Sequence, residues 1–269
     1  MIEIPRFLYG TAWKEDRTEK LVKLALAEGF RGIDTANQRR HYYEAGVGAA
    51  IRTIPREELF LQTKYTYVEG QDSRLPYDPA ADFPTQVRQS FERSLINLGT
   101  DSIDSYILHG PRSRRGLSKG DEEVWRAMEA LQREGRTRFI GVSNVTAEQV
   151  ATLCSFAEVK PAFVQNRCFA RMGWDRETRA VCRREGIIYQ GFSLLTANVQ
   201  ELQSEVMARI AAKHGASVTR VVFAFALQVG MVCLTGTGDP AHMRDDLGAV
   251  GLVLAPDEVD AIETISAGA

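Results

Sequence analysis

The stretch Gly-Phe-Arg-Gly-Ile-Asp-Thr-Ala, residues 29–36, ends a short apolar run with an acid, Asp34. Two later runs end in a similar way: Lys64 ends Leu-Gln-Thr-Lys, and His109 ends Ser-Tyr-Ile-Leu-His. Alone, each side chain would be unremarkable, since an acid often caps a helix and a lysine is usually solvated. On three successive predicted strands, each at the carboxyl end, they indicate one shared site at the mouth of a parallel sheet.

These runs belong to a series of β-branched segments that alternate with amphipathic stretches along the chain. Strands are predicted at Arg6–Ala12, Arg31–Ala36, Leu59–Tyr65, Ser102–Gly110, Thr137–Asn144, Phe163–Arg167, Ile187–Leu195 and Val232–Thr237. Helices are predicted at Arg17–Glu28, Phe83–Leu98, Glu122–Glu134, Thr146–Phe156 and Pro256–Ile265. Candidate helix caps are Thr18, Thr85 and Thr146, and candidate helix ends are Gly29, Gly99, Gly135 and Gly186.

Eight strand–helix units of roughly 30 residues predict an α/β fold, a closed (β/α)8 TIM barrel formed as one domain over residues 1–269. A doubly wound open sheet would accept the same alternation. The barrel is favoured because no Gly-x-Gly-x-x-Gly follows the first strand, where such an open sheet would usually bind a dinucleotide. We expect the irregular stretch 66–82 to be a surface loop above the strand ends.

The composition is typical of a soluble globular protein, with 44% hydrophobic and 25% charged residues. A formal net charge of −2 offers no basic field for nucleic acid or an anionic membrane. No apolar run reaches the roughly 18 residues of a membrane span, and no signal peptide is visible. The four cysteines form no Cys-x-x-Cys pair, so we expect reduced thiols and no metal site. A cytoplasmic monomer is the expected state.

Further motifs occur in a fixed order: Gly-Thr-Ala-Trp (10–13), Gly-Phe-Arg-Gly-Ile-Asp-Thr-Ala (29–36), Leu-Gln-Thr-Lys (61–64), Asp-Ser-Tyr-Ile-Leu-His-Gly-Pro (104–111), Ile-Gly-Val-Ser-Asn (140–144), Val-Gln-Asn-Arg (164–167) and Gln-Gly-Phe-Ser-Leu-Leu (190–195). In this order and spacing they resemble the aldo-keto reductase family over nearly the whole chain. The resemblance implies NAD(P)H-dependent reduction of a small-molecule aldehyde or ketone, with NADP(H) preferred and NAD(H) possible.

The family's catalytic four correspond here to Asp34, Tyr42, Lys64 and His109. Reducing a carbonyl requires a hydride at carbon and a proton at the developing alkoxide. A free tyrosine titrates near 10, so we expect Lys64 to stabilise the tyrosinate and Asp34 to keep the lysine charged. His109 either donates to the carbonyl oxygen or shares the tyrosine proton.

The tyrosine requires a choice between neighbours. In most relatives it lies five residues after the Asp, where this chain has Arg39. The segment 37–44 carries about two extra residues before Glu44, and Tyr42 matches a branch of the family that has a His-Tyr pair there. Tyr43 is the alternative, and it would otherwise pack in the first turn of the next helix.

The resemblance also implies the cofactor residues. Ser143, Asn144 and Gln165 correspond to those that hold the nicotinamide carboxamide, and Phe192 to an aromatic residue that stacks on the ring. The other expected cofactor residues are Gly10, Thr11, Ala12, Ser193, Leu195, Gly236, Thr237, His242 and Asp246. Expected substrate contacts are Trp13, Tyr65 and Tyr67, whose aromatic walls suit apolar carbonyl compounds.

The segment 234–246 departs from the family pattern, which supplies a Lys and an Arg to the 2′-phosphate of NADP. Gly236 and His242 stand at those two positions. Backbone amides at a helix start, or Arg244, could still bind the phosphate, whereas Asp239 would disfavour it.

This altered motif keeps a second function open, that of a non-redox or regulatory protein of the same fold. It would catalyse a redox-neutral elimination or isomerisation, or act as a channel-type regulatory subunit. An unrelated barrel enzyme with a metal at Asp34 and His109 is disfavoured, because no cluster has the spacing of metal ligands.

Overall fold

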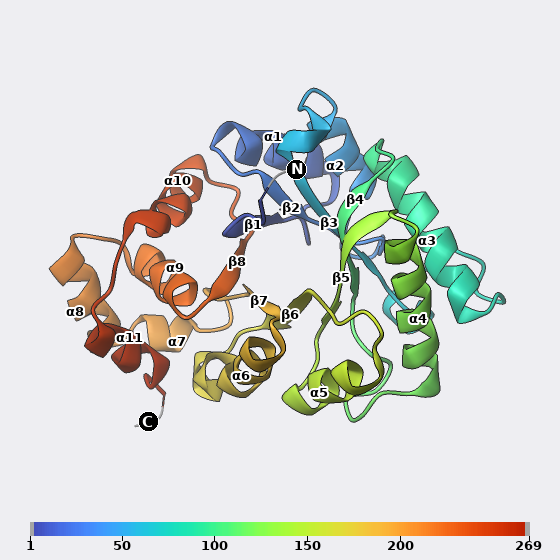
Figure 1. Ribbon diagram of the computed structural model, residues 1–269. Helices are drawn as coiled ribbons and strands as arrows, with labels where there is room; N and C mark the ends of the chain where they lie inside the picture. Colours follow the sequence, from blue (N-terminus) through green and yellow to red (C-terminus); the bar gives the residue numbers. More distant parts are fainter. Residues whose placement is uncertain (1–2, 267–269) are drawn as a thin grey trace.

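The computed structural model describes residues 3–266. Its parallel strands close into a barrel in sequence order, and β8 pairs with β1. The strands are β1 (Phe7–Gly10), β2 (Gly32–Asp34), β3 (Phe60–Tyr65), β4 (Ile103–Leu108), β5 (Thr137–Ser143), β6 (Phe163–Arg167), β7 (Ile188–Phe192) and β8 (Met231–Thr235). Helices surround them (Figure 1). The (β/α)8 prediction is therefore confirmed over the open sheet.

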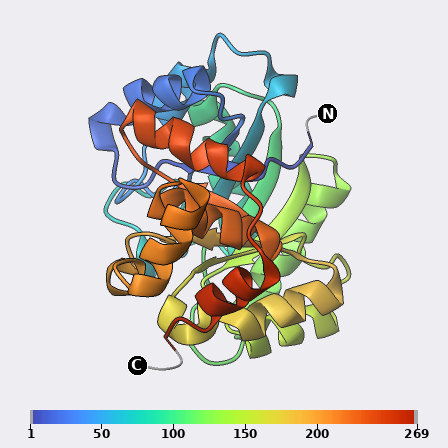
Figure 2. The ribbon, with the colours of Figure 1, turned by 90° about the vertical axis from the view of Figure 1, so that its left-hand side faces the viewer.

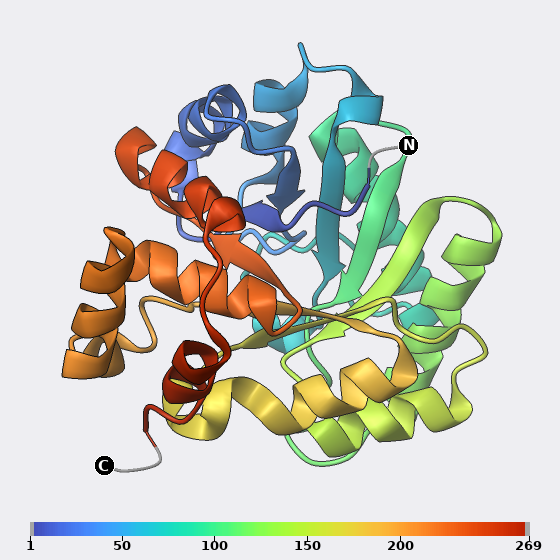
Figure 3. The same cartoon turned by 60° about the vertical axis from the view of Figure 1, so that its left-hand side comes forward.

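The helices follow the strands in alternation. They are α1 (Thr18–Ala27), α2 (Glu44–Ile51), α3 (Phe83–Leu98), α4 (Lys119–Arg133), α5 (Ala147–Phe156), α6 (Arg176–Glu185), α7 (Val199–Leu202), α8 (Glu205–His214), α9 (Val218–Gln228), α10 (Pro240–Gly248) and α11 (Pro256–Glu263). α10 lies beside α1 (Figure 2), and α8 packs on α9 near β8 (Figure 3). Within residues 3–266, no helix alone is long and apolar enough to cross a membrane, and α8 and α9 meet that criterion only as a pair bent by 90°.

Local sequence sets the helix starts, with two corrections. Thr146 caps α5 as predicted, in a reciprocal capping box. Thr85 is not a cap, because its own amide donates to the side chain of Asp82, the cap of α3. Thr18 is likewise the first residue of α1 rather than its cap. The predicted glycines at helix ends all have positive φ angles: Gly29, Gly99, Gly135 and Gly186.

The barrel interior changes character along its axis. Its lower part is apolar, filled by buried side chains from five strands: Leu8, Phe60, Ile107, Phe163, Val232 and Leu234. Because inward-facing positions recur every second residue, Phe60 is followed inside the barrel by Gln62, and Phe163 by Gln165. A polar layer therefore lies above the apolar one, toward the carboxyl ends of the strands.

The stretch 66–82 is the predicted surface loop, since most of its residues are exposed or partly exposed. It is also anchored to the barrel. Tyr67 and Tyr77 are buried, and the Tyr77 hydroxyl donates to the Thr66 carbonyl at 2.7 Å. Both rings pack against Tyr65, with ring centroids 5.3 and 5.6 Å apart.

The contact between α2 and α3 leaves no room for a side chain at Gly48. A Cβ there would collide with the backbone of Asn97 and Leu98. We expect Gly48→Ala to lower Tm by several degrees, since overpacking costs about 1–3 kcal/mol and each kcal/mol is about 2–4 °C in a chain of this size. Gly251→Ala, where a Cβ meets open space, is the matched control. Equal Tm values in calorimetry for the two variants would contradict this packing.

Candidate active site

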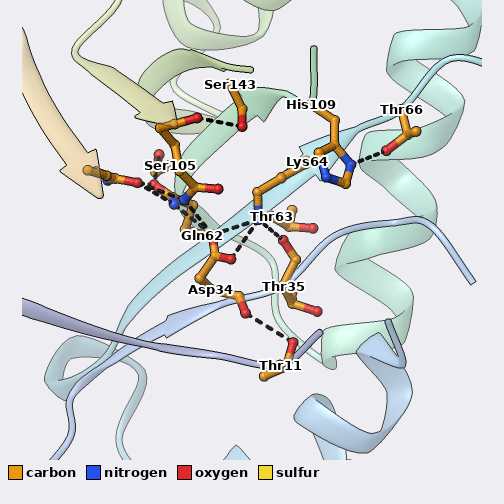
Figure 4. Close-up of polar contacts among 12 residues, drawn as sticks. Thr11, Asp34, Thr35, Gln62, Thr63, Lys64, Thr66, Ser105, His109 and Ser143 are labelled. Atoms are coloured by element: carbon orange, nitrogen blue, oxygen red, sulfur yellow. Dashed lines mark hydrogen bonds and ion pairs between the residues drawn. The ribbon is translucent and has the colours of Figure 1, made fainter. Parts of the chain in front are cut away.

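A buried ion pair between β2 and β3 forms the floor of the site. The Lys64 ammonium donates to both carboxylate oxygens of Asp34 at 2.7 Å and to the Thr35 carbonyl at 2.8 Å (Figure 4). Lys64 and Asp34 are only 0% and 2% exposed. All three N–H donors of the lysine are therefore used, which fixes its position and compensates for the burial of its charge.

Tyr42 and His109 lie above this pair. The Tyr42 ring faces the Lys64 ammonium at 5.2 Å and meets the His109 ring edge-on, with centroids 5.8 Å apart. Among the described residues, the Tyr42 hydroxyl has no hydrogen-bond partner in the protein, and Tyr42 lines the cavity described below. Its proton is thus available to a molecule bound there.

The Tyr42 phenol is buried beside a carboxylate. Burial, together with the negative charge of Asp34, raises the pKa of the Tyr42 phenol above its ordinary value. The Lys64 ammonium donates its hydrogen bonds to Asp34 and Thr35 and faces the tyrosine ring. The phenol therefore holds its proton at neutral pH.

His109 has one nitrogen anchored in the protein. Its Nδ1 lies 2.7 Å from the hydroxyl oxygen of Thr66. Burial, and then the positive charge of Lys64, lower the pKa of the His109 imidazole below its ordinary value. The ring is therefore neutral at neutral pH and can act through hydrogen bonds rather than through a charge.

Tyr43 points elsewhere. It directly precedes α2, and the guanidinium of Arg39 lies over its ring at 4.1 Å. Tyr43 lies outside the cavity that Tyr42 lines. This arrangement supports the choice of Tyr42 as the catalytic tyrosine.

A layer of amide side chains surrounds Asp34 inside the barrel. Oδ1 of Asp34 accepts from the amide nitrogens of Gln62 at 2.7 Å and Gln165 at 3.0 Å. Gln190 links the two, accepting from both at 2.8 and 2.9 Å. Ser105 donates to Gln62 from β4 at 2.8 Å. All of these side chains are buried, so each bond stabilises the position of the others.

This layer leaves one atom of Gln165 for a ligand. Both amide hydrogens of Gln165 are engaged, one by Asp34 and one by Gln190. The orientation of the amide is determined, because an ionised carboxylate can only accept hydrogen bonds. The free oxygen of Gln165 lies at the cavity wall and can accept from an N–H group such as that of the nicotinamide carboxamide.

The cavity above the catalytic residues has a volume of about 580 Å³. It brings together three of the expected catalytic residues (Asp34, Tyr42 and His109), the expected substrate residue Trp13, and most of the expected cofactor residues: Gly10, Ala12, Ser143, Asn144, Gln165, Phe192, Ser193, Leu195, Gly236 and Thr237. Lys64 lies beneath its floor, bonded to Asp34.

Three of the loops at this cavity contain a non-glycine residue in the left-handed backbone conformation, which such residues rarely adopt. Trp13, Asn144 and Ser193 have φ angles of 62°, 55° and 57°. Such left-handed conformations cost free energy and are concentrated at functional sites. Their occurrence at the ends of β1, β5 and β7, all on one cavity, supports a binding role for these loops.

Besides Lys64, five expected site residues lie outside this cavity. Thr11 is fully buried and donates to the Asp34 carbonyl at 3.0 Å. His242 is exposed on α10, and Asp246 is buried behind β8, where it accepts from Thr235 at 2.7 Å. Tyr65 is fully buried, and its hydroxyl donates to Gln86 on α3, so the structure does not bring it to a substrate.

The fifth, Tyr67, lines a second cavity of about 600 Å³, which shares His109 with the first. The other residues around it are mostly polar: Gln38, Thr66, Glu69, Gly70, Gly110, Pro111, Arg112, Ser113 and Ser118. The hydroxyl of Tyr67 donates to Asp121 at 2.9 Å rather than into the cavity. Of the three expected substrate residues, Trp13 therefore lines the first cavity, Tyr67 lines the second, and Tyr65 lines neither.

The sequence reasoning missed several residues of the first cavity. His41 stacks on Trp13 with ring centroids 3.9 Å apart, and the Arg167 guanidinium lies 5.7 Å from the centre of the Phe192 ring. Lys14 donates to the carbonyl of Gly236. His41 and Arg167 stand inside segments already singled out, so their position beside matched residues was the available signal.

Comparison with known proteins agrees with this geometry. A model of the Aldo/keto reductase family matches residues 8–267. The chain belongs to the aldo/keto reductase family. Its relatives include a glyoxal reductase of Bacillus subtilis (strain 168), 30% identical over 98% of this chain and 90% of that protein. An aldo-keto reductase of Mycobacterium avium (strain 104) is 32% identical over 94% of this chain and 83% of its own length.

Solved structures of the family show the same barrel. An aldo-keto reductase from a deep-sea metagenome library of the Medee basin superposes with a TM-score of 0.85 at 26% identity, covering 100% of this chain and 93% of its own. A silkworm (Bombyx mori) aldo-keto reductase complexed with NADPH shares the fold, with a TM-score of 0.83 at 23% identity, covering 98% of this chain and 85% of its own. Members of this family are oxidoreductases that act on small-molecule carbonyl compounds with a nicotinamide cofactor.

Gln190 offers a test of the amide layer. Gln190→Leu removes the acceptor that Gln62 and Gln165 share, so Gln165 loses one of the two bonds that orient it. We expect nicotinamide cofactor binding to weaken about tenfold, the equivalent of about 1.4 kcal/mol for a lost buried hydrogen bond. Gln200→Leu, the same change at an exposed position, is the control. An unchanged cofactor Kd in Gln190→Leu would show that the layer does not orient Gln165.

Proposed function

We propose that this protein reduces an aldehyde or ketone to an alcohol with a reduced nicotinamide dinucleotide, and that Tyr42 is the proton donor. One observation carries the proposal: Tyr42, with its hydroxyl, and the neutral His109 line the same cavity as the residues expected to hold the nicotinamide. Ser143, Asn144 and Gln165 would hold the carboxamide, with the free oxygen of Gln165 as an acceptor. Proton donor and hydride donor would then meet on one substrate.

The bound cofactor would supply the hydride. The protein supplies the proton, which passes from the Tyr42 hydroxyl to the alkoxide oxygen that develops on the substrate. The Lys64 ammonium, 5.2 Å from the ring, is fixed where it stabilises the negative charge that develops on Tyr42 as the proton leaves. Asp34 holds this ammonium and need not gain or lose a proton itself.

His109 orients the carbonyl. When its Nδ1 accepts from the Thr66 hydroxyl, the ring proton resides on Nε2, which then donates a hydrogen bond to the substrate oxygen. A neutral donor is suited to this task because it polarises the carbonyl without competing with Tyr42 for the proton transfer. Of the two roles expected for His109, this geometry supports donation to the carbonyl.

Two cavities that meet at His109 offer room for the substrate. A carbonyl group near Tyr42 would leave its substituents to the second cavity, where Tyr67 lies among polar side chains. One relative is a glyoxal reductase, so small dicarbonyl compounds are a first choice for assays. The monomeric state and the cytoplasmic location remain predictions.

Tyr42→Phe removes the proposed proton and keeps the ring. We expect turnover of a generic aldehyde such as 4-nitrobenzaldehyde to fall at least about 100-fold, as is typical for loss of a general acid. Cofactor binding, followed by quenching of tryptophan fluorescence, should be unchanged. Tyr43→Phe is the matched control and should retain activity. The reverse result would assign the role to Tyr43.

Retained cofactor binding without turnover on a broad panel of carbonyl compounds would instead favour the non-redox or regulatory function. Failure of the wild-type protein to bind either nicotinamide coenzyme would exclude the proposed reduction.

The buried neutral His109 should also influence stability. Its pKa is lowered in the folded protein, whereas in the unfolded chain it binds a proton below about pH 6.5. The unfolded state then binds more protons, so stability falls as the pH falls through about 6.5. We expect the loss of Tm between about pH 7 and pH 5 to be smaller in His109→Asn than in the wild type. The exposed His242→Asn is the control, and an equal loss in both variants would argue against a neutral buried imidazole.

A further inference from the structure

The first cavity ends at the turn between β8 and α10. Thr235, Gly236 and Thr237 line it, and the chain then passes through Asp239 into α10. The amides at the start of a helix carry partial positive charge and form a natural site for an anion such as a phosphate. The side chains around this turn therefore decide which anion the far end of the cavity accepts.

Asp239 already occupies the start of α10. Its Oδ1 accepts from the backbone amides of Ala241 at 2.7 Å and His242 at 3.3 Å. These bonds lower the pKa of the Asp239 carboxyl, so it is ionised at neutral pH. A carboxylate of the chain itself thus uses the donors that a phosphate would require and places a negative charge beside them.

The two cations that the family pattern supplies at this turn are absent. Gly236 has no side chain, and His242 stands where the family pattern has an arginine. The Arg244 guanidinium lies 2.8 Å from the carboxylate of Glu28, which directly follows α1, the helix beside α10 in Figure 2. The charge of Arg244 is therefore paired on the outer surface; like Asp239, Arg244 stands beside the cavity rather than in its lining.

Lys14 is a cation of the cavity wall near this turn. Its ammonium donates to the Gly236 carbonyl and lies 3.5 Å from where a Cβ of that glycine would be. The Lys14 ammonium thus contacts the backbone of residue 236. The ammonium of a lysine placed at position 236 would lie several bonds away from that backbone. Its charge can serve the diphosphate that all nicotinamide dinucleotides share.

We propose that Asp239 is a specificity-determining residue that rejects the 2′-phosphate of NADP(H), so that the protein binds NAD(H) at least as tightly. This inference rests on the proposed nicotinamide-dependent function and revises the expected preference for NADP(H). The nicotinamide end of the site fits either coenzyme. The mismatch with NADP(H) is confined to the phosphate end of the site. There the Asp239 carboxylate is present, and the two cations of the family pattern are missing.

The decisive variant is Asp239→Asn. Asparagine caps helices as well as aspartate does, so α10 should begin at the same residue while the charge is lost. We expect the Kd for NADPH to fall about tenfold, the effect of removing one charge close to a doubly charged phosphate, and the Kd for NADH to stay within about twofold. Both are measured by calorimetry with the full-length protein, without turnover.

Two controls separate the possible causes. Asp257→Asn removes the same charge from the exposed first turn of α11 and should change neither Kd. Lys14→Met should weaken NADH and NADPH to the same extent. Two probes without a nicotinamide repeat this test. In Asp239→Asn the Kd for adenosine 2′,5′-bisphosphate should fall, as it does for NADPH, and the Kd for 5′-AMP should stay unchanged, as it does for NADH.

Two outcomes would overturn the inference. One is a wild-type protein that binds NADPH more tightly than NADH. The other is an Asp239→Asn variant with an unchanged ratio of the two affinities. Either result leaves the proposed reduction standing, whereas binding of neither coenzyme to the wild type would remove the proposed function itself.

Discussion

The site depends on the buried pair of Asp34 and Lys64. Two charges removed from water are tolerated only when every donor and acceptor is engaged, and here the ammonium has three acceptors and Asp34 Oδ1 has further amide donors. The same contacts that compensate for burial also fix the ammonium under the Tyr42 ring. The requirement for a stable interior and the requirement for a fixed charge at the reacting tyrosine are thus met by one set of bonds.

The register between neighbouring barrel strands brings the polar side chains of this site together. Asp34 pairs with Gln62, Gln62 with Ser105, and Gln165 with Gln190, so inward-facing polar side chains from separate strands come to one level. An apolar layer below separates them from the bottom of the barrel. The polar level therefore has water and ligand on one side only, which lets a few hydrogen bonds determine the orientation of every amide.

Sequence reasoning reached the strands, the barrel and the lining of the cavity, because those follow from periodicity and from ordered motifs. The sequence alone does not show which side chains near a strand end face into the barrel. Tyr65 follows Lys64 directly and therefore points to α3, whereas Lys64 points into the barrel. Nor does a motif show that all three donors of Lys64 are already engaged by Asp34 and Thr35. The coupling among Gln62, Gln165 and Gln190 had no signal in the sequence beyond three polar residues in predicted strands.

The two ends of the cavity obey different physical constraints. At the catalytic end, the polar groups are buried, so a substitution there leaves partners unsatisfied, and the arrangement tolerates little change. At the turn before α10, the deciding groups are exposed to water, where a change of charge leaves the fold intact. Family resemblance is therefore a stronger guide to the chemistry at Tyr42 than to the coenzyme, since the phosphate end can diverge while the barrel and its buried pair stay the same.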